Sequence, residues 1–118
     1  MVKTFTADIY LGLAAGYTDK CSTIDEVREI CDSFVEKGLC VTIQQTEFRY
    51  TGGSEPGAII GLINYPRFPK TETQIMFDAT DLANLLMEEL NQFRCTIVTS
   101  EWTYLLENKN MPKEFEDK

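Results

Sequence analysis

The chain has 118 residues, of which 43% are hydrophobic and 25% charged, and this length suffices for one domain with its own core. No apolar run reaches the roughly 18 residues of a membrane span, and no signal peptide precedes the first alternating segment, so we expect a cytoplasmic protein without membrane contacts. The formal charge of −8 argues against binding of a nucleic-acid polymer, which requires clustered cations. A small anionic ligand stays compatible with this charge, because a pocket needs only a few convergent cations.

The cysteines and the missing histidine narrow the chemistry further. Cys21, Cys31, Cys40 and Cys95 form no Cys-x-x-Cys pair, and without histidine we predict no metal site and no cofactor. Cys31 and Cys40 stand at core-facing positions of predicted elements, where we expect reduced, buried thiols. The absence of histidine also removes the commonest general base, which disfavours an enzyme.

The first strand and helix have clear patterns. Residues 4–13 alternate between apolar and polar side chains, which predicts a strand with one buried face. Thr23 and Glu26 have the spacing of a capping box and mark the start of a helix. Apolar side chains then follow at helical spacing until Lys37 and Gly38, a typical helix end.

A β-hairpin is predicted next, from two segments rich in β-branched and aromatic side chains, residues 40–50 and 58–65. Residues 51–57 between them are turn formers throughout. The second segment starts Ala-Ile-Ile-Gly-Leu-Ile and is apolar at every position, so we expect a central strand that is covered on both faces. Glu47 and Glu55 flank the turn, and we interpret them as solvated charges rather than a catalytic pair.

The first strand of this hairpin changes its apolar parity between Ile43 and Phe48. One explanation is a β-bulge within residues 44–47. The other is that Phe48 and Tyr50 point to the sheet face opposite the helices, which would place them on one exposed surface with Gln44 and Thr46.

The rest of the chain repeats the helix-strand pattern. Thr71 and Gln74 have capping-box spacing and predict the start of a second helix that ends near Asn91. A later start within residues 77–81, with Asp78 or Thr80 as the cap, is the alternative. Residues 94–101 form a fourth strand, and residues 102–106 either extend it or fold over a neighbouring strand. We expect a single domain over residues 1–106 and a polar tail over residues 107–118.

The order β-α-β-β-α-β predicts an α+β, ferredoxin-like fold with an antiparallel sheet and two helices on one face. The other face would carry Asp8, Tyr10, Phe48 and Tyr50, with Trp102 and Tyr104 as candidates for the same face. An exposed aromatic surface of this kind is seldom left in water. We therefore expect a partner chain to cover it in a homo-oligomer.

The loop of residues 64–69, here called the proline corner, has the most distinctive composition. Its two prolines stiffen a short segment that carries an amide, two aromatic rings and a guanidinium. Aromatic rings stack on nucleobases, and guanidinium groups clamp phosphates. Each candidate also has a plain structural role as an alternative, in the core or as a surface charge. The ligand-binding candidates in the whole chain are Tyr17, Arg28, Phe48, Tyr50, Asn64, Tyr65, Arg67, Phe68 and Arg94, with Arg49 as a further cation nearby.

Several strings of this sequence resemble one protein family. They are IYLGL at residues 9–13 with Gly16 and Tyr17, GLCVT at 38–42, TEFRY at 46–50, the long string EPGAIIGLINYPRFP at 55–69, and NQFR at 91–94. Together they resemble the phage-encoded Thoeris anti-defence sponges of the first type described. The similarity covers most of the chain, from Ile9 to about Glu101, and the string at 55–69 is its specific part.

The resemblance implies a protein that performs no chemistry. Such sponges bind cyclic ADP-ribose isomers, the glycocyclic signals (gcADPR) of bacterial TIR-domain enzymes, and keep them from the downstream effector. The resemblance also implies dimers assembled into hexamers, ligand pockets at chain junctions and, for some members, binding of cyclic oligonucleotides. Asn64, Arg67, Phe68 and Arg94 lie within the matched strings.

Two other functions are compatible with the same sequence. One is a protein–protein inhibitor whose aromatic sheet face docks onto a host defence component. The other is a small cyclic-nucleotide hydrolase on the same scaffold, which the lack of an acid–base pair disfavours.

Overall fold

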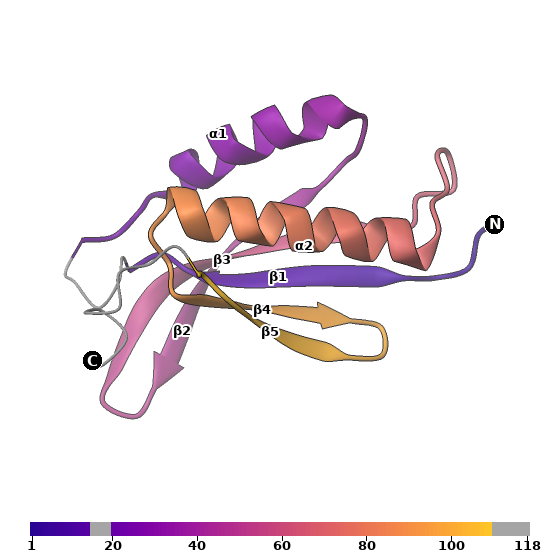
Figure 1. The fold of residues 1–118 in the computed structure, drawn as a ribbon. Helices are drawn as coiled ribbons and strands as arrows, with labels where there is room; N and C mark the ends of the chain where they lie inside the picture. The colour runs from indigo at the N-terminus through magenta and orange to yellow at the C-terminus, as the bar shows by residue number, and fades with distance from the viewer. Residues whose placement is uncertain (15–19, 110–118) are drawn as a thin grey trace.

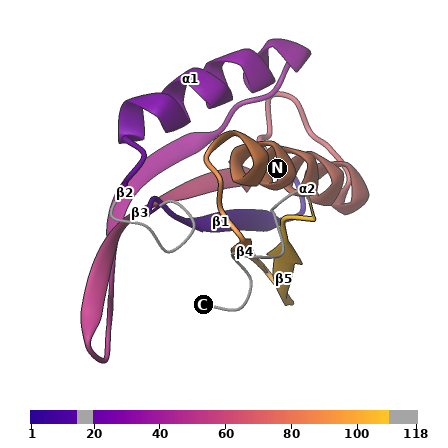
Figure 2. The same ribbon diagram turned by 60° about the vertical axis from the view of Figure 1, so that its left-hand side comes forward.

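The computed structural model describes residues 1–14 and 20–109, which form an α+β fold with one five-stranded antiparallel sheet. The sheet order is β2-β3-β1-β4-β5, and α1 and α2 both lie on one face of it (Figures 1 and 2). The predicted ferredoxin-like arrangement is confirmed, with β5 added at the edge beside β4. The elements are β1 (Thr6–Gly12), α1 (Ile24–Phe34) with the short 3-10 helix η1 (Val35–Lys37), β2 (Thr42–Tyr50), β3 (Gly53–Ile63), α2 (Glu72–Glu89), β4 (Arg94–Thr99) and β5 (Thr103–Glu107).

Both helices begin at the predicted capping boxes. Thr23 Oγ1 accepts a hydrogen bond from the Glu26 amide, and the Glu26 carboxylate accepts one from the Thr23 amide, each at 3.2 Å. Thr71 and Gln74 form the same reciprocal pair at the start of α2. These contacts satisfy backbone amides that a helix start leaves without partners.

The core lies between the two helices and the covered face of the sheet. Ile9, Ile60 and Ile97 from the three central strands are fully buried against Leu82 and Leu86 of α2 and their neighbours. Every second residue of β1 belongs to this core, as the alternation predicts. Within the described ranges, no helix combines the length and apolar character needed to cross a membrane.

In β2, the apolar side chains change from one sheet face to the other without a β-bulge, which was the second of the two explanations. The pairing with β3 runs without interruption from Thr42 opposite Gly61 to Tyr50 opposite Gly53, so no bulge intervenes. Phe48 and Tyr50 therefore share the uncovered face with Gln44, and Ile43 points toward the helices.

The turn of the hairpin is much shorter than predicted. Only Thr51 and Gly52 connect the strands, and β3 already starts at Gly53. Gly52 adopts a φ of 89°, a left-handed conformation that glycine favours. Pro56 is tolerated within β3 because the pairing with β1 begins only at Gly57, so no amide donor is required there.

The uncovered sheet face also differs from the expectation. Tyr104 lies opposite Ile97 in the β4–β5 pairing and therefore points to the helix side, while Trp102 lies in the connection before β5. The predicted placement of these two rings beside Phe48 and Tyr50 is wrong, because residues 103–107 turn back as a separate strand. β3 is central as predicted, but Ile63 is 43% exposed, so helices cover only one of its faces.

Candidate functional site

The predicted ligand-binding residues lie at two ends of the sheet. The proline corner follows the end of β3, where Ile63 pairs with Thr6. Phe48, Tyr50 and Arg94 lie toward the opposite end, where Gly12 pairs with Gly57. The length of β1 separates these ends by about 20 Å. Arg28 is on the exposed side of α1 and not on the sheet, and Tyr17 lies outside the described residues.

Asn64 fixes the shape of the proline corner. Its Nδ2 donates a hydrogen bond to the Lys3 carbonyl at 2.9 Å, and its Oδ1 accepts one from the Lys70 amide at 2.9 Å. These bonds tie the loop to the chain on either side of it. The Asn64 side chain therefore stabilises the conformation of the proline corner. Arg67 and Phe68 of the same loop are exposed to solvent.

Two aromatic rings form the outer part of the proline corner. Tyr65 and Phe68 have ring centroids 5.3 Å apart and an interplanar angle of 39°. The Cys40 thiol donates to the Tyr65 hydroxyl at 3.5 Å, and this contact together with burial raises the pKa of Tyr65. The crevice beneath the rings has only about 10 Å³ of free volume, so a nucleotide would have to bind on the outer surface.

The arginines divide into two paired and two unpaired groups. Arg28 forms an ion pair with Asp25 at 2.6 Å, and Arg49 forms one with Glu47 at 2.9 Å. Arg67 and Arg94 have no acidic partner within the part of the chain that the structure describes, although Glu107 is opposite Arg94 in the strand pairing. An unpaired guanidinium on the surface can bind a phosphate without first losing a carboxylate.

Glu55 occupies a different environment from the one predicted. Its carboxylate accepts a hydrogen bond from the Ala14 amide at 3.1 Å and lies over Gly12, where an added Cβ would come within 2.7 Å of it. The side chain is half-buried, because Glu55 belongs to β3 and not to the turn. The interpretation as a solvated charge is therefore wrong for Glu55, whereas Glu47 remains exposed.

On the uncovered face, an aromatic ring packs on a glycine near the end of the sheet where Gly12 pairs with Gly57. An added Cβ at Gly57 would collide with the Phe48 ring, so this ring rests directly on the β3 backbone. Asp8, nearer the middle of the face, lies over Gly61 in the same way, and burial raises its pKa. The glycines let polar and aromatic side chains lie flat across the strands.

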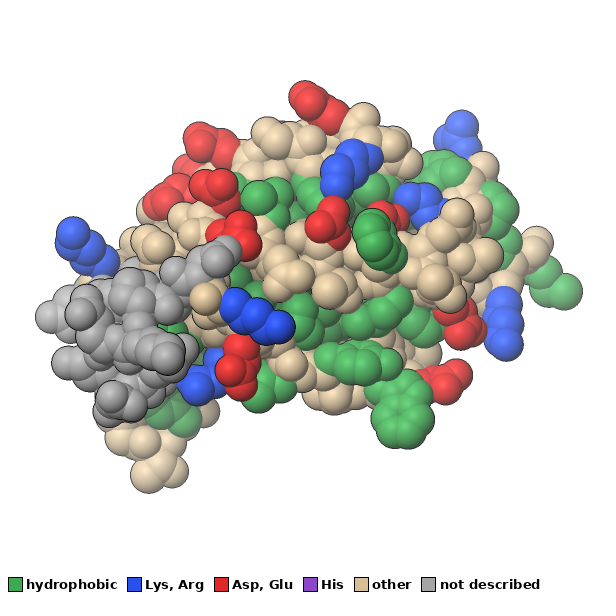
Figure 3. Space-filling view, in the orientation of Figure 1, with side chains coloured by type: hydrophobic (Ala, Val, Ile, Leu, Met, Phe, Trp, Pro, Cys, Tyr) green, Lys and Arg blue, Asp and Glu red, His purple; other side chains and the backbone are tan. Residues whose placement is uncertain are grey.

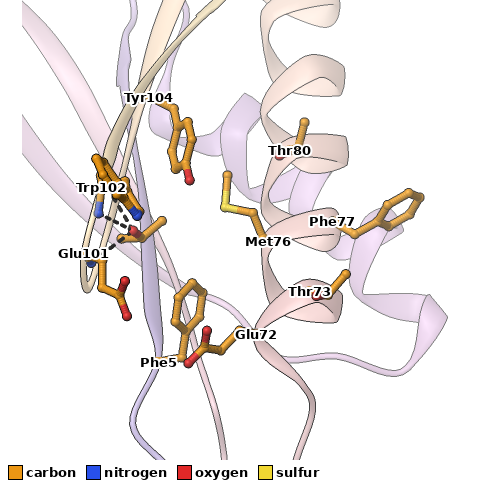
Figure 4. A pocket seen from close by; sticks show the side chains of 10 residues that line it. Phe5, Glu72, Thr73, Met76, Phe77, Thr80, Glu101, Trp102 and Tyr104 are labelled. Atoms are coloured by element: carbon orange, nitrogen blue, oxygen red, sulfur yellow. Dashed lines mark hydrogen bonds between the residues drawn. The ribbon is translucent and has the colours of Figure 1, made fainter.

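A second concave region was missed by the sequence analysis. It is a cleft of about 480 Å³ between α2 and the β4–β5 hairpin, lined by the rings of Phe5, Trp102 and Tyr104 among others (Figure 4). Its existence depends on β5 folding back beside β4, which the sequence left open. The aromatic residues that line it are visible in the sequence, but they are far apart along the chain, and no sequence pattern indicates that they meet.

The core thiols are poor nucleophiles. Burial and the nearby Asp32 carboxylate raise the pKa of Cys31 to about 11, and burial raises the pKa of Cys95 to about 12. Cys21 and Cys40 are exposed, so the prediction of a buried Cys40 is wrong; it precedes β2 and contacts Tyr65 at the surface. Across residues 1–14 and 20–109, no three cysteine or acidic side chains come together as a metal site.

Comparison with known proteins identifies the fold but not a family. No protein-family model and no curated protein sequence matches the chain. Two solved structures of a phage SAM lyase are similar. The structure in the apo state has a TM-score of 0.74 at 17% identity, covering 92% of both chains. The structure in complex with S-methyl-5'-thioadenosine has a TM-score of 0.71 at 15% identity, covering 92% of this chain and 93% of the other. At these identities the likeness establishes a shared fold.

The environments of the cysteines predict that two of the four thiols react quickly and that the other two do not. At pH 8, Cys21 and Cys40 should react with a thiol reagent such as DTNB within minutes. Cys31 and Cys95 should stay unmodified, because they are buried and remain protonated well below their raised pKa values. Counting modified thiols by mass spectrometry, before and after unfolding in guanidinium, checks this. Rapid reaction of three or four thiols in the folded protein would contradict the described core.

Proposed function

We propose that this chain is a phage counter-defence protein that binds glycocyclic ADP-ribose and sequesters it without degrading it. The observation that carries the proposal is that Arg67 and Arg94 have no acidic partner among the described residues. Each lies within a string that resembles the Thoeris sponges. Two guanidinium groups that have no acidic partner among the described residues are available for an anionic ligand, even in an acidic protein.

The chemistry of the ligand agrees with the groups at the proline corner. A cyclic ADP-ribose carries two phosphates and an adenine base. Arg67 can form paired hydrogen bonds with a phosphate, and the exposed ring of Phe68 offers a stacking surface worth about 1–3 kcal/mol per base. The phage SAM lyase in complex with S-methyl-5'-thioadenosine supports the adenosine part, since a protein of this fold binds an adenine nucleoside.

The separation of the two arginines points to a site shared between copies. About 20 Å of sheet lies between the proline corner and Arg94 in one chain, so one compact ligand cannot touch both there. A second copy that brings its Arg94 end beside the proline corner would complete the pocket. The same contact would cover exposed apolar side chains of the open sheet face, such as Ile63 and Leu105.

Sequestration requires no catalytic group, and the ligand is expected to leave intact. The protein acts as a binder in the cytoplasm of the infected cell, in a dimer-based oligomer that extends to a hexamer. The same surface chemistry, cations beside flat rings, is also suited to cyclic oligonucleotides as further ligands.

The first test is binding and recovery of the signal. Purified protein incubated with a glycocyclic ADP-ribose isomer should release the unchanged molecule on heating, as measured by chromatography with mass detection. Arg67→Ala and Arg94→Ala should each weaken binding at least about tenfold, the loss expected for a charged hydrogen-bonded contact. Arg49→Ala is the matched control, because Arg49 is already paired with Glu47. Recovery of linear ADP-ribose instead would reject the sponge.

A mixing experiment tests the shared site. If each pocket takes Arg67 from one chain and Arg94 from another across a two-fold axis, a refolded mixture of the two alanine variants regains up to about a quarter of the wild-type sites. Neither variant alone should show these tight sites in calorimetry. A mixture that binds no better than its components would place both arginines in one chain's pocket or in none.

A second candidate function is a lyase acting on the sulfonium compound SAM, and Glu55 is the observation that favours it. Its half-buried carboxylate is held by the Ala14 amide over the open face, in a fold shared with phage SAM lyases. Incubation with SAM should then yield S-methyl-5'-thioadenosine, and Glu55→Gln should lower the rate at least about a hundredfold if the carboxylate acts as an acid or base. Unchanged SAM after prolonged incubation with the wild-type protein would exclude this candidate.

A further inference from the structure

The cleft between α2 and the β4–β5 hairpin is a second concave surface, distinct from the proline corner. Hydrophobic side chains gather there between the two elements (Figure 3). Phe5 lies at one end of the cleft, with Met76 of α2 on one side and Trp102 and Tyr104 of the hairpin on the other (Figure 4). Its volume of about 480 Å³ is within the range of small-molecule sites.

The hairpin side of the cleft is held in place before any ligand binds. Thr99 Oγ1 accepts hydrogen bonds from the Trp102 amide at 2.8 Å and the Glu101 amide at 3.2 Å, and it donates to the Trp102 carbonyl at 2.9 Å. Ser100 Oγ accepts from the Thr6 amide at 3.0 Å, which ties the turn to β1. Trp102 is 66% exposed, so its ring is accessible to a ligand in the cleft while these bonds hold its backbone.

The charge of the cleft is negative. Glu72 and Glu101 lie on its two sides, and none of the lining residues is a lysine or an arginine. Lys3 forms a long ion pair with Glu72, with Nζ 3.9 Å from the carboxylate, but the Lys3 side chain is 87% exposed. A doubly anionic nucleotide would be repelled here, so the cleft is not the site proposed above for glycocyclic ADP-ribose.

We propose that this cleft binds a small methylated onium cation, such as a quaternary ammonium or sulfonium group. Aromatic faces attract cations, and the tryptophan face is the strongest of them. A bare ammonium would need several close hydrogen-bond acceptors, which the ring and methionine surfaces do not supply. An onium group with methyl substituents makes apolar contacts with these surfaces, and Glu72 and Glu101 balance its charge at the edges.

The single tryptophan of the chain makes the test direct, because Trp102 lines the cleft and its fluorescence reports only on this region. Acetylcholine serves as the cationic probe, and 3,3-dimethylbutyl acetate serves as its neutral isostere. Acetylcholine should produce a saturable change in emission and bind about tenfold more tightly than the neutral ester. Equal affinity of the two probes, or no saturable change, would overturn the proposal.

Carboxylate variants separate charge recognition from simple apolar binding. Glu101→Gln and Glu72→Gln should each weaken acetylcholine binding several-fold and leave the neutral ester unchanged. Glu89→Gln, an exposed carboxylate at the other end of α2, is the matched control. Retained acetylcholine affinity in a Glu72→Gln/Glu101→Gln double variant would overturn the proposal. Arg67→Ala should not affect this binding, so the outcome is independent of the sponge function.

Discussion

The central constraint in this molecule is that β1 pairs with both β3 and β4 while only one face of the resulting sheet receives helices. Ile9 and Leu11 of β1 are fully buried in the core with α2, and the alternate residues Asp8 and Tyr10 face away from the helices. An antiparallel sheet suits this one-sided burial, because it can pack helices against one face and leave its other face uncovered.

That second face is unusual in how flat its side chains lie. Glycines in β1 and β3 let Phe48, Glu55 and Asp8 rest on the strand backbones. Apolar side chains of Ile59 in β3 and Leu105 in the edge strand β5 are on the same face. The proposed shared pocket needs the approach of a second copy, because the proline corner and Arg94 lie at opposite ends of one chain.

Electrostatics separates the two candidate sites. The chain has a formal charge of −8, yet Arg67 and Arg94 have no acidic partner among residues 1–14 and 20–109. Glu72 and Glu101, by contrast, border an aromatic cleft on the helix side. Anionic and cationic ligands would therefore be directed to different surfaces of the same fold. The lyase-like fold does not decide between binding and catalysis, since function resides in these side chains and not in the strand order.

Local patterns in the sequence determined the types of β1 to β4 and of both α-helices, and both capping boxes, because helix starts and alternation depend on neighbouring residues only. The order of the strands in the sheet was predicted only by analogy with the ferredoxin-like arrangement. The predicted length of the hairpin turn was wrong because residues 53–57, although rich in turn formers, pair with β2 as part of β3. The rings of Tyr50 and Phe48 in β2 occupy the space that Gly53 and Gly57 leave free. The candidate arginines were visible in the sequence, but their pairing state was not, since an ion pair depends on where two side chains point. The position of β5 and the cleft it forms with α2 were decided by the tertiary structure alone, because residues far apart in the chain build that cleft and no local pattern records their contact.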